Sequence, residues 1–253
     1  MSSTPFDHSI ADAEHHLDLP VSVLMPVCNE AAVIEAVLAE WHREVFVRLP
    51  AGSELLLDEA ASNDGTREIL ERLRQVYPYL RVTYTPRKDG FGVAARRLYL
   101  SARCPWVFFT DSDGQYVPAE FWKLARFTGT FDVIHGAKIG RQDPFLRRLA
   151  SFSFNTIAHV IFDTHYTDIN SAFRLMRREQ VVPIVERCRH MPTLLNAELL
   201  LRCEFEGLTI CQCRVRHRAR SDGASRGLPP LSFPGECLRA YRGLRALRTE
   251  YLS

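Results

Sequence analysis

Apolar and polar residues alternate in blocks along the first half of the chain. Val21 to Met25 and Trp106 to Thr110 are short apolar runs, typical of buried β-strands, and the second is apolar enough for the centre of a sheet. Glu30 to Val45 instead carries apolar residues at helical spacing, with Asn29 placed to cap the helix. The same periodicities predict strands at 54–57, 81–85 and 131–136, and helices at 66–76, 90–101 and from Pro118 onward.

Strands that alternate with helices indicate an α/β fold, in which a mostly parallel sheet is flanked by helices within a single domain. Ligands bind such sheets beyond the carboxyl ends of the strands. Three polar clusters lie at those ends, at 26–30, 58–64 and 111–115. We therefore expect the functional site where these three segments meet.

The regular alternation of strand and helix patterns ends after Gly140. Residues 141–162 are basic and then amphipathic, and 168–174 are predicted to form a polar loop. A helix at 196–206, a strand at 209–215 and a basic helix at 236–251 complete the prediction.

Composition and charge narrow the classes of function. The net charge of +2 carries no general signature of nucleic-acid binding, but arginines outnumber acids between Arg214 and Arg248. Such a local basic surface suits phosphate groups or lipid headgroups, and the alternative is a solvated charged face. Seven cysteines without a CxxC pair argue against a disulfide framework or a zinc site. No signal peptide or membrane span is visible, so we expect a cytoplasmic protein.

The sharpest chemical signal is Asp111-Ser112-Asp113, directly after the central strand. Two carboxylates at a strand end can converge on one hard cation, and oxygen ligands favour Mg²⁺ or Mn²⁺ over zinc. Gln115 could add a carbonyl oxygen. A cation there would bridge the diphosphate of a nucleotide sugar and offset charge as the sugar–oxygen bond breaks. The alternative is a turn that caps the next helix.

Two further clusters follow the first and second strands. Pro26 to Glu30 places backbone amides and a carboxylate at the mouth of the first strand, although helix capping by Asn29 would also explain it. Asp58 to Thr66 adds carboxylates that can accept hydrogen bonds from a base or a ribose.

In these segments the chain resembles family 2 glycosyltransferases of the GT-A fold, most closely the polyprenyl-phosphate branch of the dolichol-phosphate mannosyltransferase type. The resemblance runs from about Val21 to Gly227. It rests on motifs in chain order: P-x-x-N-E at 26–30; Glu59, Ser62, Asp64, Gly65 and Thr66 of an acidic signature; the glycine turn Gly90 to Ala94; D-x-D-x-Q at 111–115; Gly136 to Lys138 with Arg147 to Ser151; Asp168 to Arg174; and Arg220, Gly223, Ser225 and Arg226.

The resemblance implies roles for these residues. Asp113 and Asp168 would act in catalysis, Asp168 as a base or a positioning group, unless it only orders its turn. The metal would be bound by Asp111, Asp113 and Gln115, and the acceptor phosphate by Lys138, Arg141, Arg147 and Ser151. The donor would be bound by Pro26, Asn29, Glu30, Glu59, Asp64, Gly90, Asp111, Ser112, Arg220 and Arg226, with the two arginines clamping the diphosphate.

One departure from the family pattern concerns the nucleobase. Where the family has Asp-Gly after the first acid of the second cluster, this chain has Ala60-Ala61. Glu59 is favoured as the base-binding acid because Glu59 to Thr66 keeps the length of the motif. A second register would use Asp58.

The resemblance implies inverting, metal-dependent hexosyl transfer from a nucleotide-diphosphate sugar to a polyprenyl phosphate, peripherally on the inner face of a membrane. Two alternatives stay open: a soluble or polysaccharide hydroxyl acceptor, and a catalytically silent nucleotide-sugar-binding protein. Residues 1–20 would be a flexible tail and 21–227 the transferase domain, with its nucleotide-sugar half at 21–136 and its acceptor half at 137–227. Within the last segment, 228–253, the basic amphipathic helix would lie on an anionic leaflet or pack on the domain; its apolar residues are Leu238, Tyr241, Leu244 and Leu247.

Overall fold

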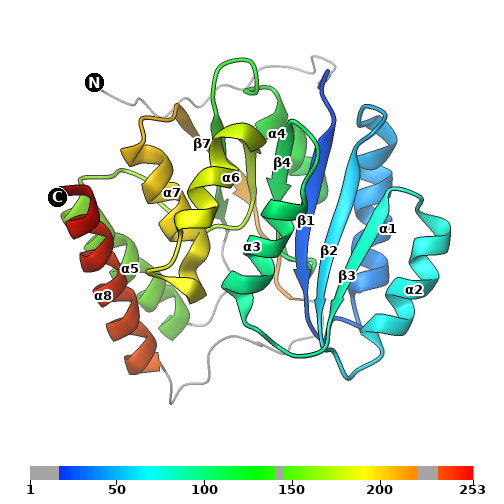
Figure 1. Ribbon diagram of the computed structural model, residues 1–253, viewed down its shortest axis with the longest axis horizontal. Helices are drawn as coiled ribbons and strands as arrows, with labels where there is room; N and C mark the ends of the chain where they lie inside the picture. The colour runs from blue at the N-terminus through cyan, green and yellow to red at the C-terminus, as the bar shows by residue number, and fades with distance from the viewer. Residues whose placement is uncertain (1–16, 141–144, 221–232, 253) are drawn as a thin grey trace.

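The computed structural model describes residues 17–140, 145–220 and 233–252 (Figure 1). Most of the predicted tail therefore lies outside the described residues, although Leu17 is buried in the core. Seven strands form one sheet in the order β3-β2-β1-β4-β6-β5-β7. Their bounds are Val21–Val27 (β1), Glu54–Ala60 (β2), Leu80–Thr85 (β3), Trp106–Phe109 (β4), Val133–Ile139 (β5), Arg174–Arg177 (β6) and Ile210–Arg216 (β7).

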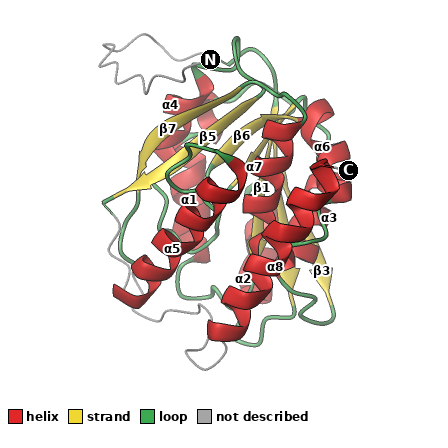
Figure 2. Ribbon diagram, turned by 90° about the vertical axis from the view of Figure 1, so that its left-hand side faces the viewer, coloured by secondary structure: helices red, strands yellow, loops and turns green. Residues whose placement is uncertain are grey.

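Helices cover both faces of this sheet (Figures 1 and 2). The helix α3 packs on β1 and β2 and contacts α6 and α7, while α1 and α2 lie behind the sheet in Figure 1. The helices are Ile34–Glu44 (α1), Thr66–Val76 (α2), Phe91–Ser101 (α3), Phe121–Ala125 (α4), Phe145–Phe162 (α5), Arg178–Arg187 (α6), Leu195–Phe205 (α7) and Phe233–Leu252 (α8), with 3₁₀ turns at Phe46–Arg48 (η1), Pro118–Glu120 (η2) and Pro192–Leu194 (η3).

The predicted α/β architecture is confirmed, including the central place of β4, whose four residues are all buried. All strand pairs are parallel except those of β6, which runs antiparallel to β4 and to β5. Neither β6 nor α6 was predicted. The short strand at Arg174–Arg177 runs directly into the helix that begins at Arg178, so neither element shows a clean period of its own.

The predicted helix cap at Asn29 is wrong. The helix α1 begins at Ile34, and its N-cap position is Val33, which provides no side-chain hydrogen bond. Asn29 has a left-handed φ of 56°, and its Oδ1 accepts a hydrogen bond from the backbone of Asn63 at 2.9 Å. The side chain thus joins two loops instead of closing a helix, because tertiary contacts outweigh the local capping preference.

The C-terminal helix α8 packs on the domain and also presents an exposed apolar face. Leu244 and Leu247 are fully buried, and the helix contacts α5 and α7. Leu238 and Tyr241 are exposed. The expected packing of this helix on the domain is therefore confirmed, and its contact with a membrane stays a prediction. In the part of the chain that the structure describes, no helix is long and apolar enough to cross a membrane.

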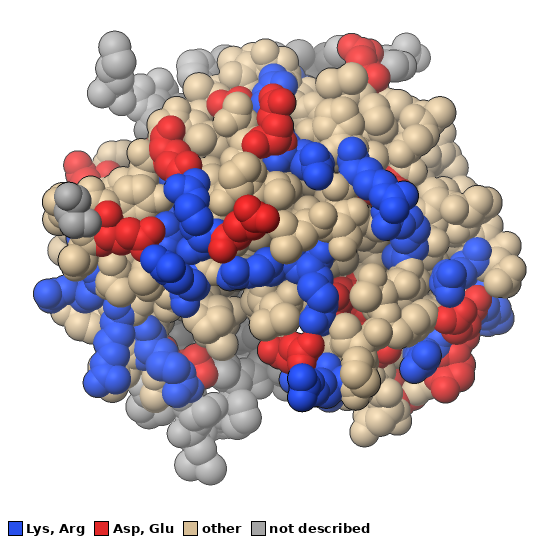
Figure 3. Space-filling view, in the orientation of Figure 1, with Lys and Arg blue, Asp and Glu red and all other residues tan. Residues whose placement is uncertain are grey.

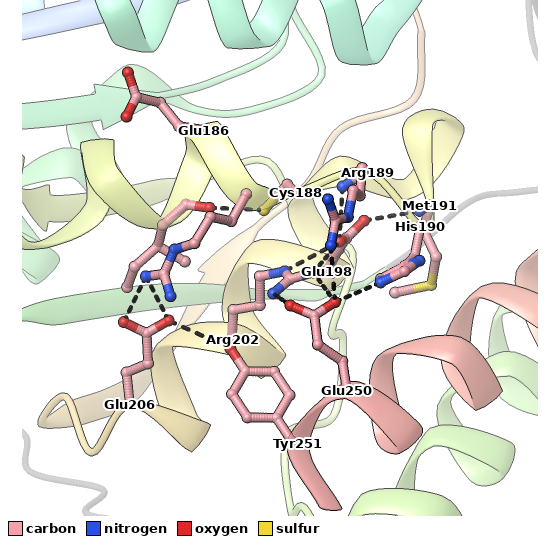
Figure 4. Close-up of polar contacts among 12 residues, drawn as sticks. Glu186, Cys188, Arg189, His190, Met191, Glu198, Arg202, Glu206, Glu250 and Tyr251 are labelled. Atoms are coloured by element: carbon pink, nitrogen blue, oxygen red, sulfur yellow. Dashed lines mark hydrogen bonds and ion pairs between the residues drawn. The ribbon is translucent and has the colours of Figure 1, made fainter. Parts of the chain in front are cut away.

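A buried ion pair fixes the end of α8 to the domain (Figure 4). Arg202 on α7 is fully buried; it donates to Glu198 at 3.0 Å and to both oxygens of Glu250 on α8 at 2.8 and 3.1 Å. His190 lies 2.6 Å from Glu250. Hydrogen bonds from Arg202, and then from His190, lower the pKa of Glu250 to about 2. This network ties α7 and α8 to the loop that joins α6 to α7.

Arg202→Met should lower the free energy of unfolding by about 3–5 kcal/mol, because it leaves the buried carboxylate of Glu198 without its cation. Arg187 offers a matched control, since its ion pair with Glu206 is half exposed and worth at most about 1 kcal/mol. Urea denaturation of both variants measures the difference. Equal losses in Arg202→Met and Arg187→Met would contradict a buried ion pair at this position.

Candidate functional site

The carboxyl ends of β1, β2 and β4 lie side by side, because these strands are parallel neighbours in the sheet. Hydrogen bonds join the three loops that follow them. The Oγ of Ser112 donates to the carbonyl of Pro26 at 2.8 Å, and the backbone of Asn29 donates to the Oγ of Ser62 at 2.8 Å. The three polar clusters predicted to meet are thus brought together.

Asp64 links the loop after β1 to the start of α2. Its carboxylate accepts hydrogen bonds from the backbone of Ala31 at 3.1 Å and from the hydroxyl of Thr66 at 2.6 Å. Burial raises the pKa of Asp64, but these hydrogen bonds lower it by more, so its pKa lies below the usual value. The backbone of Glu30 in turn donates to Thr66 at 2.9 Å. Asp64 therefore holds the mouth of the first strand in place.

The two acids at the end of β2 have different partners. Asp58 is buried, and both of its oxygens accept hydrogen bonds from Arg97 on α3, at 2.7 and 3.0 Å. Arg97 also donates to Asp89 at 2.8 Å. Glu59 is equally buried and accepts a hydrogen bond from the backbone of Ser62 at 2.6 Å. Because successive residues of a strand face opposite sides of the sheet, the two acids belong to different surroundings.

The backbone shortly after Glu59 adopts a conformation typical of glycine. Ala61 has a left-handed φ of 46°, a conformation that favours glycine over residues with a Cβ atom. This supports the register in which Ala61 stands at the glycine of the family signature and Glu59 at its first acid. The role of Glu59 as the base-binding acid stays a prediction.

The predicted metal ligands follow β4 in a tight loop. Asp111 and Asp113 are both half-buried, and the Oδ1 of Asp113 accepts the backbone N–H of Gln115 at 3.0 Å. The side-chain amide of Gln115 donates to the carbonyl of Arg218 at 3.1 Å, and the backbone of Arg218 donates to the carbonyl of Gln115 at 2.7 Å. Gln115 therefore joins this loop to the segment that follows β7.

That segment delivers Arg220 to the acidic loops. One nitrogen of its guanidinium donates to both oxygens of Glu30, at 2.8 and 2.7 Å, and another lies 3.7 Å from the Oδ2 of Asp113. The three side chains are mostly buried. A positive charge is thus held between two carboxylates from different loops, at the carboxyl edge of the sheet.

A second group of charges surrounds Tyr116, just after the Asp111 to Gln115 loop. The Nζ of Lys138 lies 3.7 Å from the carboxylate of Asp168 and 5.7 Å from the centre of the Tyr116 ring. Burial raises the pKa of Tyr116; Lys138 opposes that shift, whereas Asp111 and Asp168 add to it. The predicted acceptor lysine and the predicted catalytic acid Asp168 therefore lie together, next to the loop of the predicted metal ligands.

Arg174, the last residue of the predicted Asp168 to Arg174 loop, is a buried structural arginine. It donates to the Nδ1 of His135 at 3.1 Å and to the carbonyls of Asn196 and Ile169. Burial, reinforced by the charge of Arg174, lowers the pKa of His135 well below its usual value. The imidazole is therefore neutral, and the pair fixes the loop that carries Asp168.

The structure leaves several predicted residues untested. Arg141 and Arg226 lie outside the described residues, as does the side chain of Arg147, whose backbone lies in α5. Ser151 is half-buried on α5, and Gly90 precedes α3 with a φ of 92°.

Three residues of the site were missed in the sequence. Arg97 forms an ion pair with Asp58, Tyr116 lies beside Lys138, and His217 forms a β-bridge with Tyr116. Tyr116 had a usable signal, because it directly follows Gln115. Arg97 and His217 had none, since their partners are distant in the chain.

Comparison with known proteins agrees with the resemblance. The family model described as Glycosyl transferase family 2 matches residues 22–182. A dolichyl-phosphate hexose transferase of Haloferax volcanii is 27% identical over 206 residues, covering 79% of this chain and 84% of that protein. An undecaprenyl-phosphate 4-deoxy-4-formamido-L-arabinose transferase of Aeromonas hydrophila subsp. hydrophila is 27% identical over 212 residues, covering 81% of this chain but only 62% of that protein's length.

A solved structure shares the fold. Glucosyl-3-phosphoglycerate synthase from Mycobacterium tuberculosis, in complex with Mn²⁺, uridine diphosphate and phosphoglyceric acid, matches with a TM-score of 0.68 at 18% identity, over 91% of this chain and 79% of that chain. The expected GT-A architecture is confirmed. Because the family model spans well over half of the residues, the chain belongs to glycosyl transferase family 2.

Proposed function

We propose that this protein transfers a sugar, with inversion, from a nucleoside-diphosphate sugar to a polyprenyl phosphate at a membrane surface, in a reaction that needs Mg²⁺ or Mn²⁺. The observation that carries the proposal is the convergence of Glu30, Asp113 and Arg220 at the end of the central strand. Such a pairing of acidic and basic groups suits a ligand that brings both a cation and a diphosphate.

The residues at this edge fit a hard divalent cation. Asp111 and Asp113 offer carboxylate oxygens, and the guanidinium 3.7 Å from Asp113 shows that this carboxylate faces a position favourable to positive charge. Within the described ranges, no three His, Cys, Asp or Glu side chains gather into a group that could hold a metal ion. The chain would provide the two carboxylates and, as predicted, a carbonyl oxygen of Gln115, and substrate oxygens and water would complete the coordination. A cation bound there supplies electrostatic stabilisation of the departing diphosphate.

The remaining residues bind and orient the substrates. Arg220 can exchange its bonds with Glu30 for charge-assisted hydrogen bonds to the diphosphate. Lys138 is placed to attract the phosphate of the acceptor, and Asp168 holds the lysine in position. A phosphate acceptor is already anionic near neutral pH, so transfer to it requires no strong general base. Asp168 is then a positioning residue rather than a proton acceptor.

The choice of a polyprenyl acceptor rests on two observations. The relatives from Haloferax volcanii and Aeromonas hydrophila are named as dolichyl-phosphate and undecaprenyl-phosphate transferases. In addition, α5 exposes Phe152 and Val160, with 69% and 82% of their surface accessible, and it packs beside α8, which exposes further apolar residues. Exposed apolar groups next to arginines suit an anionic membrane surface.

A soluble phosphorylated acceptor is the second candidate. The Mycobacterium tuberculosis structure, which shares this fold, contains phosphoglyceric acid. Lys138 would serve a phosphate on a small molecule as well as one on a lipid. Radiolabelled sugar that enters an organic-extractable, acid-labile product supports the lipid acceptor, whereas label that stays in the aqueous phase supports the soluble one.

Asp113→Asn should reduce sugar transfer by about 10²- to 10³-fold, because it removes charge from the group that stabilises the leaving diphosphate. The melting temperature should stay close to that of the unaltered protein, since Asp113 is not part of the core. Asp163→Asn is the matched control, an exposed acid after α5. The measurement is transfer from radiolabelled nucleotide sugars with Mn²⁺ and polyprenyl phosphate. Full activity of Asp113→Asn would refute the role of this carboxylate.

Arg220→Gln should tighten the binding of Mn²⁺ in the absence of nucleotide by roughly tenfold, because it removes a competing cation beside Asp113. Arg218→Gln is the control, since Arg218 pairs with Glu40 on α1. Free Mn²⁺ is measured by electron paramagnetic resonance during titration. An unchanged or weaker affinity in Arg220→Gln would show that the cation does not bind at this position.

Lys138→Met should raise the KM for the acceptor at least about tenfold, with a much smaller effect on the KM for the donor, because it removes a charged partner of the acceptor phosphate. Lys123→Met changes the same charge at a lysine that pairs with Glu120 instead, and should leave both constants near their normal values. Steady-state kinetics with each substrate varied in turn provides the test. Equal effects on the two KM values would count against an acceptor role.

A further inference from the structure

A cavity of about 350 Å³ opens between α8 and the loop that joins α6 to α7. Gly243 allows α8 and this loop to meet at the base of the cavity. A Cβ atom on this residue would come within 2.5 Å of the Met191 side chain and 2.7 Å of the His190 carbonyl. Leu194 and Ala246 add apolar surface to the lining. The cavity therefore has an apolar floor, held in place by the ion pairs of Figure 4.

Three arginines surround the opening of this cavity. Arg189 comes from the loop, and Arg239 and Arg242 come from α8. All three are exposed, and Lys and Arg side chains gather over this side of the molecule (Figure 3). Arg239 pairs with Glu236, and Arg189 lies 4.0 Å from Glu250. Arg242 has no ion pair with any residue in the described ranges, so its charge is available to a ligand.

The arrangement along α8 places the cavity beside an exposed apolar face. Arg239, Arg242 and Ala246 are spaced three and four residues apart, so they share the side of the helix that lines the cavity. Leu238 and Tyr241 project from the neighbouring side, with 48% and 41% of their surface accessible. A ligand in the cavity would thus present its anionic group to the arginines, while its apolar part continued along the helix.

We propose that this cavity binds the phosphate headgroup of an anionic phospholipid and thereby holds α8 on the membrane. The charge of the opening matches a phosphodiester, and the apolar floor and adjacent face match the first carbons of acyl chains. The inference rests on the membrane-surface part of the proposed function. It adds a lipid site separate from the residues around Asp113.

Vesicle binding by the full-length protein tests this site. Vesicles of phosphatidylcholine, with and without phosphatidylglycerol, are sedimented with the unaltered protein and with Arg242→Ala, Arg245→Ala and Ala246→Leu. Arg245 is the matched control, because it carries the same charge on the same helix and does not line the cavity. Loss of one surface charge weakens binding to anionic vesicles about fivefold in either arginine variant.

Arg242→Ala should weaken binding to the phosphatidylglycerol vesicles at least about tenfold more than Arg245→Ala does, because it also removes a direct contact with the phosphate. Ala246→Leu should weaken binding as well, since it fills the cavity without changing charge. Equal losses in the two arginine variants, or normal binding by Ala246→Leu, would overturn the proposal.

Two further measurements identify the source of the phosphate and test whether vesicle binding depends on sugar transfer. If glycerol phosphate raises the melting temperature through Arg242 while the vesicles do not bind, the ligand is a soluble phosphoester and the lipid proposal fails. The vesicles contain no polyprenyl phosphate and no nucleotide sugar is added. Asp113→Asn should therefore bind them normally, so failure of the proposed transfer reaction and failure of this lipid site give different results.

Discussion

Negative charge at the carboxyl edge of the sheet is the constraint around which this site is built. Glu30 and Asp113 lie on loops that follow neighbouring strands, and Arg220 bonds to the first and approaches the second. Carboxylates brought together in a half-buried position repel each other unless a cation lies nearby. The arginine provides that cation in the absence of substrate. A bound metal would then take the place of Arg220 beside Asp113, and the diphosphate would take the place of Glu30 beside Arg220.

This constraint also explains the path of the chain after β7. That strand is at the edge of the sheet, and β5 and β6 separate it from β4. The segment beyond it nevertheless returns to the loop after β4, where His217 pairs with Tyr116 and Arg218 with Gln115. The return brings Arg220 to the acids. Tyr116 pairs with this returning segment and also lies next to Lys138, so it contacts both charged parts of the candidate site.

The first half of the fold could be predicted from the sequence, because each element there has its own local signal. Buried apolar runs marked β1, β2 and β4, and the polar clusters after them met as expected. The antiparallel strand β6 and the helix α6 could not be predicted, since the strand has only four residues and joins the helix directly. Asn29 was misassigned because its partner, Asn63, belongs to another loop. Arg97 was missed for the same reason, because an ion pair between α3 and β2 produces no periodic pattern in the sequence.

We expect Asp111 and Asp113 to hold a divalent cation against the diphosphate of the donor. A crystal structure with Mn²⁺ and a nucleoside diphosphate tests it most directly, since the anomalous signal of manganese locates the ion. We expect a manganese peak within bonding distance of both carboxylates and of phosphate oxygens, with Arg220 turned from Glu30 toward the diphosphate. A nucleotide bound with these two carboxylates facing away from its phosphates, and no manganese between them, would contradict it.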